Sequence, residues 1–469
     1  MHYLALPLIG VHALAIVFAF RRGQEMQALP GISWLFLAVL PFWIVSGRFA
    51  EDTANIQLIG ISVVSIAICL SDAFASAYAR VPAKTERLSI DGLLLPVLVV
   101  FVLLIPIVHL LSAGHVPLIE RLNPDLSPEE LAMIRENFSK LLALPEFIKV
   151  VFNWNIVLFA PVLTAYLVKT ERWRGAVFVA VWTVLYALAS SARLPFILYL
   201  ANTFLIIVLL APPRVGRTVV ICTIGGLSVL TAATQERVAA LDQWYELASA
   251  SGTEMPGFGQ FQAHASRTGL PVTPGDMERL DDRLLDEQRP STFTRYGDYA
   301  VYRAFLGPIE VANRWYAFFP DASGGWRPMR DLVPLPGLRS AQHAANRLAI
   351  WAYVERFPRN YFQTSRAYAG LDADAYSYGG LILVALAGFV LLIIRILGVL
   401  LLSSGRLSAI LYGLLLSFYT VFPFQASIQA MLFSHGMLVV FVGMLILKIG
   451  SQMGPVARGS ARSVVADDK

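Results

Sequence analysis

The stretches TVVICTIGGLSVLTA at residues 218–232 and GGLILVALAGFVLLII at residues 379–394 contain no charged side chain. An α-helix crosses a bilayer with ~20 predominantly apolar residues, so both stretches are candidate membrane-spanning helices. The segment between them, 233–378, is polar and rich in Arg, Tyr and Trp, and is therefore too polar to lie in lipid. We interpret the chain as a membrane protein whose large segment works on one face, on something presented at the membrane surface.

The composition extends this interpretation to the whole chain. It is 57% hydrophobic and 15% charged, with a mean hydropathy of +0.62, which is typical of a protein that crosses the membrane many times. We therefore expect an all-α polytopic membrane protein with about eleven transmembrane helices. The candidate segments are 3–20, 31–46, 56–78, 92–112, 150–168, 175–191, 194–211, 218–232, 379–402, 407–421 and 428–448.

Basic residues orient this bundle. If the N-terminus is outside the cytoplasm, the inner loops contain nearly all of the short-loop Arg and Lys, which is the positive-inside pattern. These residues are Arg21, Arg22, Arg80, Lys84, Arg87, Lys169, Arg172, Arg174, Arg214, Arg217 and Arg406. No signal peptide is evident, because the first apolar run is followed by basic residues rather than preceded by them.

This orientation divides the chain into membrane and extramembrane parts. Transmembrane helices fill 1–112, 150–232 and 379–450, and the tail 451–469 is cytoplasmic. A small loop at 113–149, with an amphipathic helix that starts near Ser127, and the large helical or irregular loop at 233–378 lie outside the cytoplasm.

Several function classes lack support in the sequence. The only cysteines, Cys69 and Cys222, fall inside predicted spans, so they give the outer loops no disulfide framework. We find no phosphate-binding loop, zinc spacing or dinucleotide fingerprint, and expect neither cofactor nor metal. The net charge of +5 follows from membrane orientation, so we do not expect nucleic-acid binding.

Arg193, in SSARLPF, is the first candidate site residue. It stands between two apolar runs at the outer end of the sixth predicted span. Ionisable residues at such depth usually face a cavity or a partner, although an arginine that extends its charge to the membrane surface is the alternative.

The second half of the large loop alternates arginines with aromatic residues. Flat aromatic faces stack on sugars or on arginines, and guanidinium groups bind phosphate in a bidentate fork. A solvated or structural role stays open for each residue. Lysines are few in the whole chain, so the preference for arginine over lysine is not specific to this loop. The candidates are Arg295, Arg303, Arg314, Arg359, Tyr299, Tyr302, Trp315 and Tyr361.

Carboxylates near these arginines could accept a proton, and Glu310 and Glu355 are the candidate bases. Asp372 and Asp374 superficially match a metal-binding pair of nucleotide-sugar transferases. We expect them instead to cap the ninth span or to hydrogen-bond sugar. Within the spans, we expect Arg395 to extend toward the inner surface and His435 to hydrogen-bond a neighbouring helix.

With these features the chain resembles the bacterial O-antigen or exopolysaccharide repeat-unit polymerases of the Wzy type. The resemblance rests on the layout of spans around one large extracytoplasmic loop and on two sequence elements. SSARLPFILYLANTFLIIVLL, at 190–210, is similar to the family's small-residue–Arg turn that opens an apolar helix. LDADAYSYGGLILVALAGFVLL, at 371–392, is similar to its aromatic-Gly re-entry into the membrane, here Tyr378-Gly379.

The resemblance implies a GT-C-like fold in the bacterial inner membrane and a glycosyl transfer on its periplasmic face. Two undecaprenyl-diphosphate-linked oligosaccharides would meet there, and a hydroxyl of one would displace the diphosphate of the other. Arg193 would bind the diphosphate, and Glu310 or Glu355 would accept the hydroxyl proton. The remaining arginines, the aromatic residues, Asp372 and Asp374 would contact phosphate or sugar. A chain-length regulator and a flippase are the further partners that it implies.

Three other interpretations stay open. An O-antigen ligase shares the substrate, the side of the membrane and the loop plan, with His264 and His343 as its loop histidines. A flippase would show paired halves with intramembrane charges along a path, and we find no internal repeat. A non-catalytic assembly subunit would leave the arginines dispensable.

Overall fold

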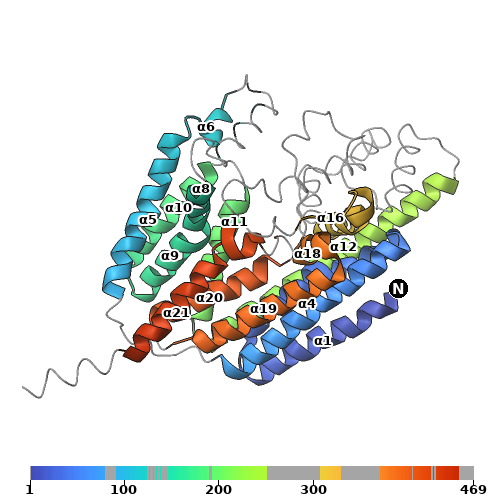
Figure 1. Cartoon of the computed structure of the whole chain (residues 1–469), viewed down its shortest axis with the longest axis horizontal. Coiled ribbons are helices and arrows are strands. Elements are labelled where there is room, and N and C mark those ends of the chain that lie inside the picture. Colours follow the sequence, from blue (N-terminus) through green and yellow to red (C-terminus); the bar gives the residue numbers. More distant parts are fainter. Residues whose placement is uncertain are drawn as a thin grey trace, which may run out of the picture.

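The computed structural model describes residues 2–79, 91–123, 126, 130, 134, 138, 146–189, 193–250, 307–328, 370–403, 405–423, 426 and 429–453. Within these residues the regular secondary structure is helical, and no strand is present. The fold is a helical bundle, and its long helices run from one end of the bundle to the other (Figure 1).

The bundle has the helices of a membrane protein. Six are long and apolar enough to cross a bilayer: Glu25–Val45, Glu51–Tyr78, Leu95–Ser112, Val150–Lys169, Pro213–Gln235 and Leu381–Leu401. Shorter apolar helices cover Leu6–Arg21, Trp173–Ala189, Pro195–Leu209, Arg406–Val421 and Met437–Ser451. The prediction of an all-α membrane protein is confirmed. Six helices have the length and composition of a membrane span, and the expected number of eleven spans stays a prediction.

These segments are built from elements with the following bounds. The first half contains α1 (His2–Arg21), η1 (Glu25–Ala28), α2 (Leu29–Trp34), η2 (Leu35–Val39), α3 (Leu40–Val45), η3 (Ser46–Arg48), α4 (Glu51–Tyr78), α5 (Asp91–Ser112), α6 (Pro117–Glu120), α8 (Glu146–Trp154), η4 (Asn155–Phe159), α9 (Ala160–Lys169), α10 (Trp173–Ala189), α11 (Arg193–Leu209) and α12 (Pro213–Ala250). The second half contains α16 (Gly307–Ala317), η6 (Phe318–Ala322), α18 (Leu371–Gly379), α19 (Leu381–Leu401), α20 (Arg406–Val421), η9 (Ala430–Ser434) and α21 (Met437–Met453).

Helix α4 is the central packing element. It packs against α1, α2, α16, α18 and α19, and Figure 1 shows α1, α4 and α19 side by side. A side chain on Gly388 of α19 would meet the Ala67 Cβ of α4 at 3.4 Å, so two small residues allow this close approach. Small residues play the same part in other membrane helix pairs, where lipid gives no hydrophobic drive to association.

The outer surface of the bundle is apolar. Leu111 and Ile382 are 80% and 79% exposed, and Phe389 is 58% exposed. Many large apolar side chains exposed on several helices are unfavourable in water and fit contact with lipid.

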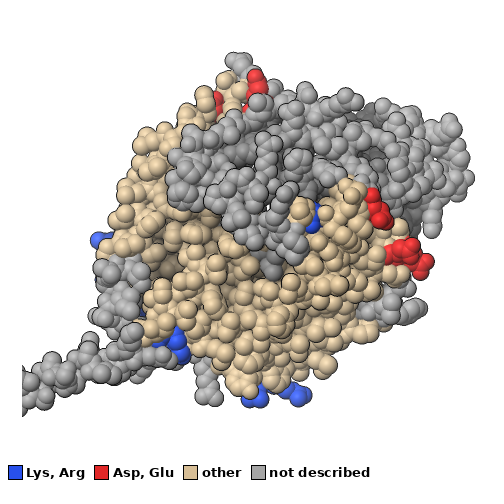
Figure 2. Space-filling view, in the orientation of Figure 1, with Lys and Arg blue, Asp and Glu red and all other residues tan. Residues whose placement is uncertain are grey.

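Most exposed basic residues lie at one end of the bundle and most exposed acidic residues at the other, with exposed Glu171, between Lys169 and Arg172, and exposed Arg121, in the small loop, as exceptions. In Figure 2 most Lys and Arg lie along the lower and left edges, and Asp and Glu lie at the upper and right edges. We call these the basic end and the acidic end. The basic end contains the exposed Arg21, Arg22, Lys169, Arg172, Arg174, Arg214 and Arg217, and the acidic end contains the exposed Glu51, Asp52 and Asp321.

Helix α12 continues well beyond the expected span 218–232. It runs without interruption for 38 residues, to Ala250, so the first part of the predicted large loop is helical. In Figure 1 its far end projects past the neighbouring helices.

The small loop is described only in part. Glu130, Ile134 and Phe138 are helical and spaced four residues apart, and Phe138 is buried against His109, with ring centroids 4.4 Å apart. This is the spacing and the contact that an amphipathic helix on the bundle would give.

Candidate functional site

A polar and aromatic cluster lies at the acidic end, where α16 and α18 pack on α4 and η6 packs on α16 and α18 (Figure 1). Pro308 favours the start of α16, since a first-turn proline loses no hydrogen bond. Helix α18 begins after Gly370, has both Asp372 and Asp374 in its first turn, and ends before Gly380. Gly380 has φ 69°, a conformation that glycine adopts without strain.

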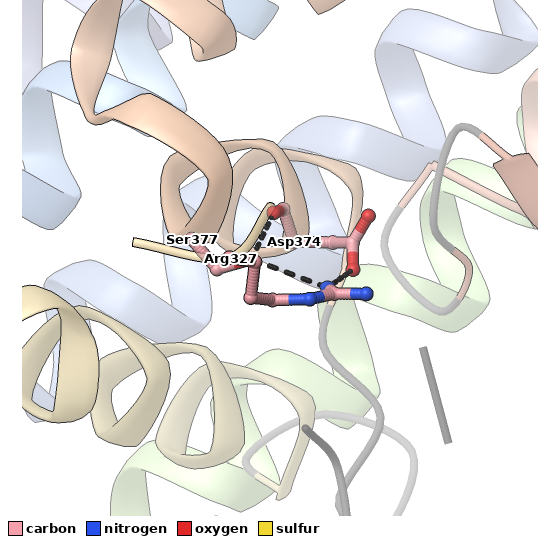
Figure 3. Close-up of polar contacts among 3 residues, drawn as sticks. All are labelled: Arg327, Asp374 and Ser377. Atoms are coloured by element: carbon pink, nitrogen blue, oxygen red, sulfur yellow. Dashed lines mark hydrogen bonds and ion pairs between the residues drawn. The ribbon is translucent and has the colours of Figure 1, made fainter. Parts of the chain in front are cut away.

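Arg327 is the centre of the first half of this cluster. Its Nη1 donates to Asp374 Oδ1 at 2.8 Å and to Ser377 Oγ at 3.2 Å (Figure 3). Its backbone N–H also donates to the Ser377 carbonyl, at 2.9 Å. Arg327 is 5% exposed and Asp374 is 4% exposed, so this is a buried ion pair that joins the residues after η6 to α18.

Aromatic rings cover the guanidinium of Arg327. Its carbon lies 4.0 Å from the ring centroid of Tyr378 and 5.6 Å from that of Trp315. Burial raises the pKa of Asp374, and the adjacent Arg327 opposes this rise. The charge pair is thus held in surroundings that exclude water, where electrostatic interactions are strong.

Tyr316 and Asp372 form the second half. The Tyr316 hydroxyl donates to Asp372 Oδ2 at 3.2 Å. Burial raises the pKa of Asp372 to about 6, although hydrogen bonds from the Ala373 N–H and Tyr316 favour the charged form. This carboxyl therefore titrates near neutrality, as groups with a proton-transfer role often do.

Helix α16 is anchored to α4 by a buried amide pair. Asn313 Nδ2 donates to Gln57 Oε1 at 2.8 Å, and Gln57 Nε2 donates to the Ile309 carbonyl at 3.2 Å. Gln57 and Asn313 are buried, so these bonds fix where α16 meets the bundle.

A small cavity of about 10 Å³ lies beneath this cluster. It has room for about one water molecule and is too small for a sugar ring. It is mainly apolar, with the Asp372 carboxyl as its charged neighbour, and is lined by Trp34, Ala38, Ile61, Pro308, Ile309, Ala312, Gly370 and Asp372.

Three of the predicted site residues contact this cluster: Trp315, Asp372 and Asp374. Trp315 is 2% exposed and stacks on Phe319 with centroids 5.4 Å apart, so its ring packs on protein and is not presented as an open sugar platform. Arg314 is 1% exposed. The aspartates do not cap the membrane helix α19, whose N-cap is Gly380, but bind Tyr316 and Arg327.

The other predicted residues are placed only in part. Arg193 is the first residue of α11 and Glu310 lies in α16, but their side chains are outside the described residues. The rest also lie outside them: Arg295, Tyr299, Tyr302, Arg303, Glu355, Arg359 and Tyr361.

A second polar group lies inside the bundle; the sequence interpretation noted Arg395 but missed the other members. We call it the internal cluster. It contains His12 of α1, Gln27 of η1, Asp72 of α4, Arg395 of α19, and Tyr412 and Tyr419 of α20, all of them at most 1% exposed. A lone acid in the apolar run of α4 was the available sequence signal, because ionisable residues within membrane helices are costly.

Arg395 differs from its expected position. It does not extend to the inner surface: it is 0% exposed, and its Nη2 donates to Gln27 Oε1 at 2.7 Å. Gln27 also accepts from the Tyr412 hydroxyl at 2.7 Å, so polar partners from two other elements keep the guanidinium inside the bundle. His435 contacts the neighbouring helix α8 as expected, with Asn153 Nδ2 at 3.4 Å from its Nδ1.

No group of His, Cys, Asp and Glu with the arrangement of a metal site occurs among the described residues. Comparisons with known proteins add no identity: no family model matches the chain, and no curated protein or solved structure matches it significantly.

A glycine on α4 tests the contact between the site and the bundle. A Cβ on Gly60 would overlap the Tyr316 hydroxyl, so Gly60→Ala should displace Tyr316 from Asp372 and destabilise the protein by about 1–3 kcal/mol. Adding Tyr316→Phe removes the overlapping oxygen and should recover part of the loss, measured as the denaturation midpoint of purified protein. Gly225→Ala, where no atom lies within 4 Å, is the control. Equal effects of the two alanines would contradict the packing argument.

The pKa of Asp372 predicts a pH-dependent stability. The folded-state pKa of about 6 exceeds the ordinary 3.8, so the folded state binds more protons between these values, and its stability falls as pH rises through this window. The difference corresponds to roughly 3 kcal/mol. The Asp372→Asn variant lacks this titratable group. As pH rises from 4 to 7.5, its free energy of unfolding should therefore increase relative to that of the parent by up to this amount. Asp52→Asn, at an exposed acid of α4, should show a much smaller trend in the same denaturation series.

Proposed function

We propose that this protein is a polysaccharide polymerase of the bacterial inner membrane. It joins undecaprenyl-diphosphate-linked oligosaccharide repeat units into O-antigen or exopolysaccharide on the periplasmic face. The observation that carries the proposal is the buried cluster of Arg327, Asp374, Trp315 and Tyr316 at the acidic end. It fixes the final part of the arginine- and aromatic-rich segment against the membrane helices.

The arrangement of charge supports the side on which this chemistry takes place. The cluster lies at the end opposite most of the exposed basic residues. Since basic loops face the cytoplasm, the acidic end is the periplasmic one, with the N-terminus periplasmic and the C-terminus cytoplasmic. The five shorter apolar helices complete eleven spans in this arrangement.

The reaction is a displacement at an anomeric carbon. The hydroxyl oxygen of one repeat unit forms the new C–O bond, the bond from the anomeric carbon to the diphosphate oxygen breaks, and undecaprenyl diphosphate leaves with the bonding electrons. Arginines, with Arg193 the first of them, stabilise the charge of the leaving diphosphate. Glu310 or Glu355 accepts the hydroxyl proton.

A deletion strain tests this function. Surface polysaccharide of the deletion, parent and complemented strains is separated on a gel. Material that stops at one repeat unit on the lipid A–core, or loss of long exopolysaccharide with export intact, is the expected result. Accumulated lipid-linked polymer would identify a ligase instead, and lipid-linked single units trapped inside would identify a flippase. An unchanged ladder in a strain without a second polymerase would refute the proposal.

Arg193→Ala tests the central residue. Because a fixed cation at the diphosphate should contribute about 10²–10³-fold to the rate, the complemented strain should lose long polymer. Arg174→Ala, an exposed arginine at the basic end, is the matched control and should restore the full ladder. Protein levels in the membrane are compared by immunoblot. Full polymer from Arg193→Ala at equal protein level would remove this residue from the mechanism.

A further inference from the structure

The internal cluster lies at a depth where charge is costly. Asp72 precedes the last residue of α4, Tyr78, by six positions, and Arg395 precedes Leu401 of α19 by the same number. At 1.5 Å per residue, both lie roughly 9 Å inside the basic end of their helices. Charged groups at such positions normally mark a pathway or a binding site.

The Asp72 carboxyl has few hydrogen-bond donors. Its Oδ2 accepts from the Gly31 N–H at 2.8 Å, whereas its Oδ1 is buried and accepts no hydrogen bond in the described part of the chain. A buried carboxylate that stays ionised is usually held by two or three donors. The negative charge of Asp72 is therefore poorly compensated by contacts.

The nearby cation does not pair directly with Asp72. Arg395 acts on Asp72 through its field, but no ion pair joins the two among the described residues. Its guanidinium donates to Gln27 and lies 5.4 Å from the Tyr412 ring centroid. Its Nε and Nη1 are buried without a hydrogen-bond partner in the same set of residues.

His12 lies beside Asp72. A Cβ built on Gly31 would lie 2.7 Å from Asp72 Oδ2 and 3.5 Å from His12 Nδ1. The carboxyl and the imidazole thus occupy the space next to the same glycine. His12 Nδ1 also contacts Cys69 Sγ at 3.3 Å, and its Nε2 is buried without a described partner.

The other titratable groups do not neutralise this pair. Tyr412 donates to Gln27 and Tyr419 donates to the Leu391 carbonyl. Glu25 on η1 is held by Arg217 at 2.6 Å. Cys69 is the remaining titratable group on α4 that faces the pair.

We propose that Asp72 and His12 form an internal proton-binding site in the half of the bundle next to the basic end. A proton taken from water on that side adds to the Asp72 carboxylate, and the carboxyl becomes neutral. His12 is the neighbouring base that can hold the same proton. Arg395 opposes loading through its positive charge, so the site binds and releases a proton instead of staying permanently protonated. The inference does not depend on the proposed polymerase activity.

Infrared spectroscopy tests the site in the purified full-length protein. Difference spectra between pH 5 and pH 8 detect the C=O stretch of a carboxylic acid that forms at the lower pH. We expect Asp72→Asn to remove one component of this band, and Asp72→Glu to shift the component instead of removing it. Asp372→Asn is the matched control: it removes the contribution of the buried Asp372 carboxyl and leaves the Asp72 component in place.

The opposite result is equally clear. If Asp72→Asn and the parent give the same carboxylic acid band in the pH difference spectrum, Asp72 does not change its protonation state in this range, and the proposal is refuted. If Asp72→Asn does not fold, Asp72→Glu decides, because an unshifted band in that variant refutes the proposal in the same way. Neither result changes the expected polysaccharide ladder of the deletion strain.

Discussion

Replacing Arg327 by alanine is expected to lower the free energy of unfolding by roughly 3–5 kcal/mol, because it leaves Asp374 buried without its cation. Asp374 is 4% exposed, and Arg327 Nη1 is its donor at 2.8 Å. The substitution also removes the group that packs over Tyr378 at 4.0 Å. Chemical denaturation of the purified protein, followed by tryptophan fluorescence, measures the loss.

A double-mutant cycle separates the ion pair from the packing. Asp374→Asn in the Arg327→Ala background removes the uncompensated charge and should recover a large part of the stability. Arg172→Ala, at an exposed arginine of the basic end, should change stability by about 0.5 kcal/mol or less. If the double variant is as unstable as Arg327→Ala alone, the contribution of Arg327 is packing and not charge.

The second large effect is expected at Arg395. Arg395→Met should destabilise the protein by roughly 3–5 kcal/mol at pH 8, since it removes the cation nearest to a buried Asp72. Gln27 Oε1 accepts hydrogen bonds from Arg395 Nη2 and from the Tyr412 hydroxyl, and the substitution removes the first of these. At pH 5 the loss should be smaller, because protonated Asp72 no longer needs a counter-charge. Denaturation midpoints at the two pH values give the comparison.

Removing both charges provides the control for Arg395. Asp72→Asn combined with Arg395→Met should be considerably more stable at pH 8 than Arg395→Met alone, because neutral residues of similar size often replace a buried charge pair without loss. Arg214→Met, at an exposed arginine of the basic end, is the control and should have a much smaller effect. A pH-independent loss at Arg395 would mean that shape, not charge, accounts for its role.

The membrane helices could be predicted from the sequence because an apolar run of bilayer length is a local signal. The segment 379–402 needs only its own composition to be recognised, and it corresponds to α19. The sites could not be predicted in the same way. Arg327 finds Asp374 47 positions later, and Arg395 finds Gln27 368 positions earlier, and no pattern in the sequence marks such pairs.

The arginines selected as site residues show where prediction from the sequence fails. In the aromatic-rich segment, Arg314 and Trp315 were expected to face a substrate, but both are almost fully buried. Spacing along a chain shows which residues are neighbours in sequence, but it does not show which helix covers them. The arginine that pairs with Asp374 lies after a turn at Gly324 and Gly325, both with positive φ, in a region that has no helical periodicity to interpret.

Because of helix α12, the two ends of the large segment lie at different distances from the acidic end of the bundle. With 38 residues it is about 57 Å long, nearly twice the ~30 Å of hydrocarbon, so it carries Ala250 well beyond the acidic end. The chain comes back at the bundle itself, where the Leu371 N–H donates to the Pro423 carbonyl at 2.8 Å. Under the proposed function, a polysaccharide that extends away from the membrane at the acidic end would have the projecting part of this helix beside it.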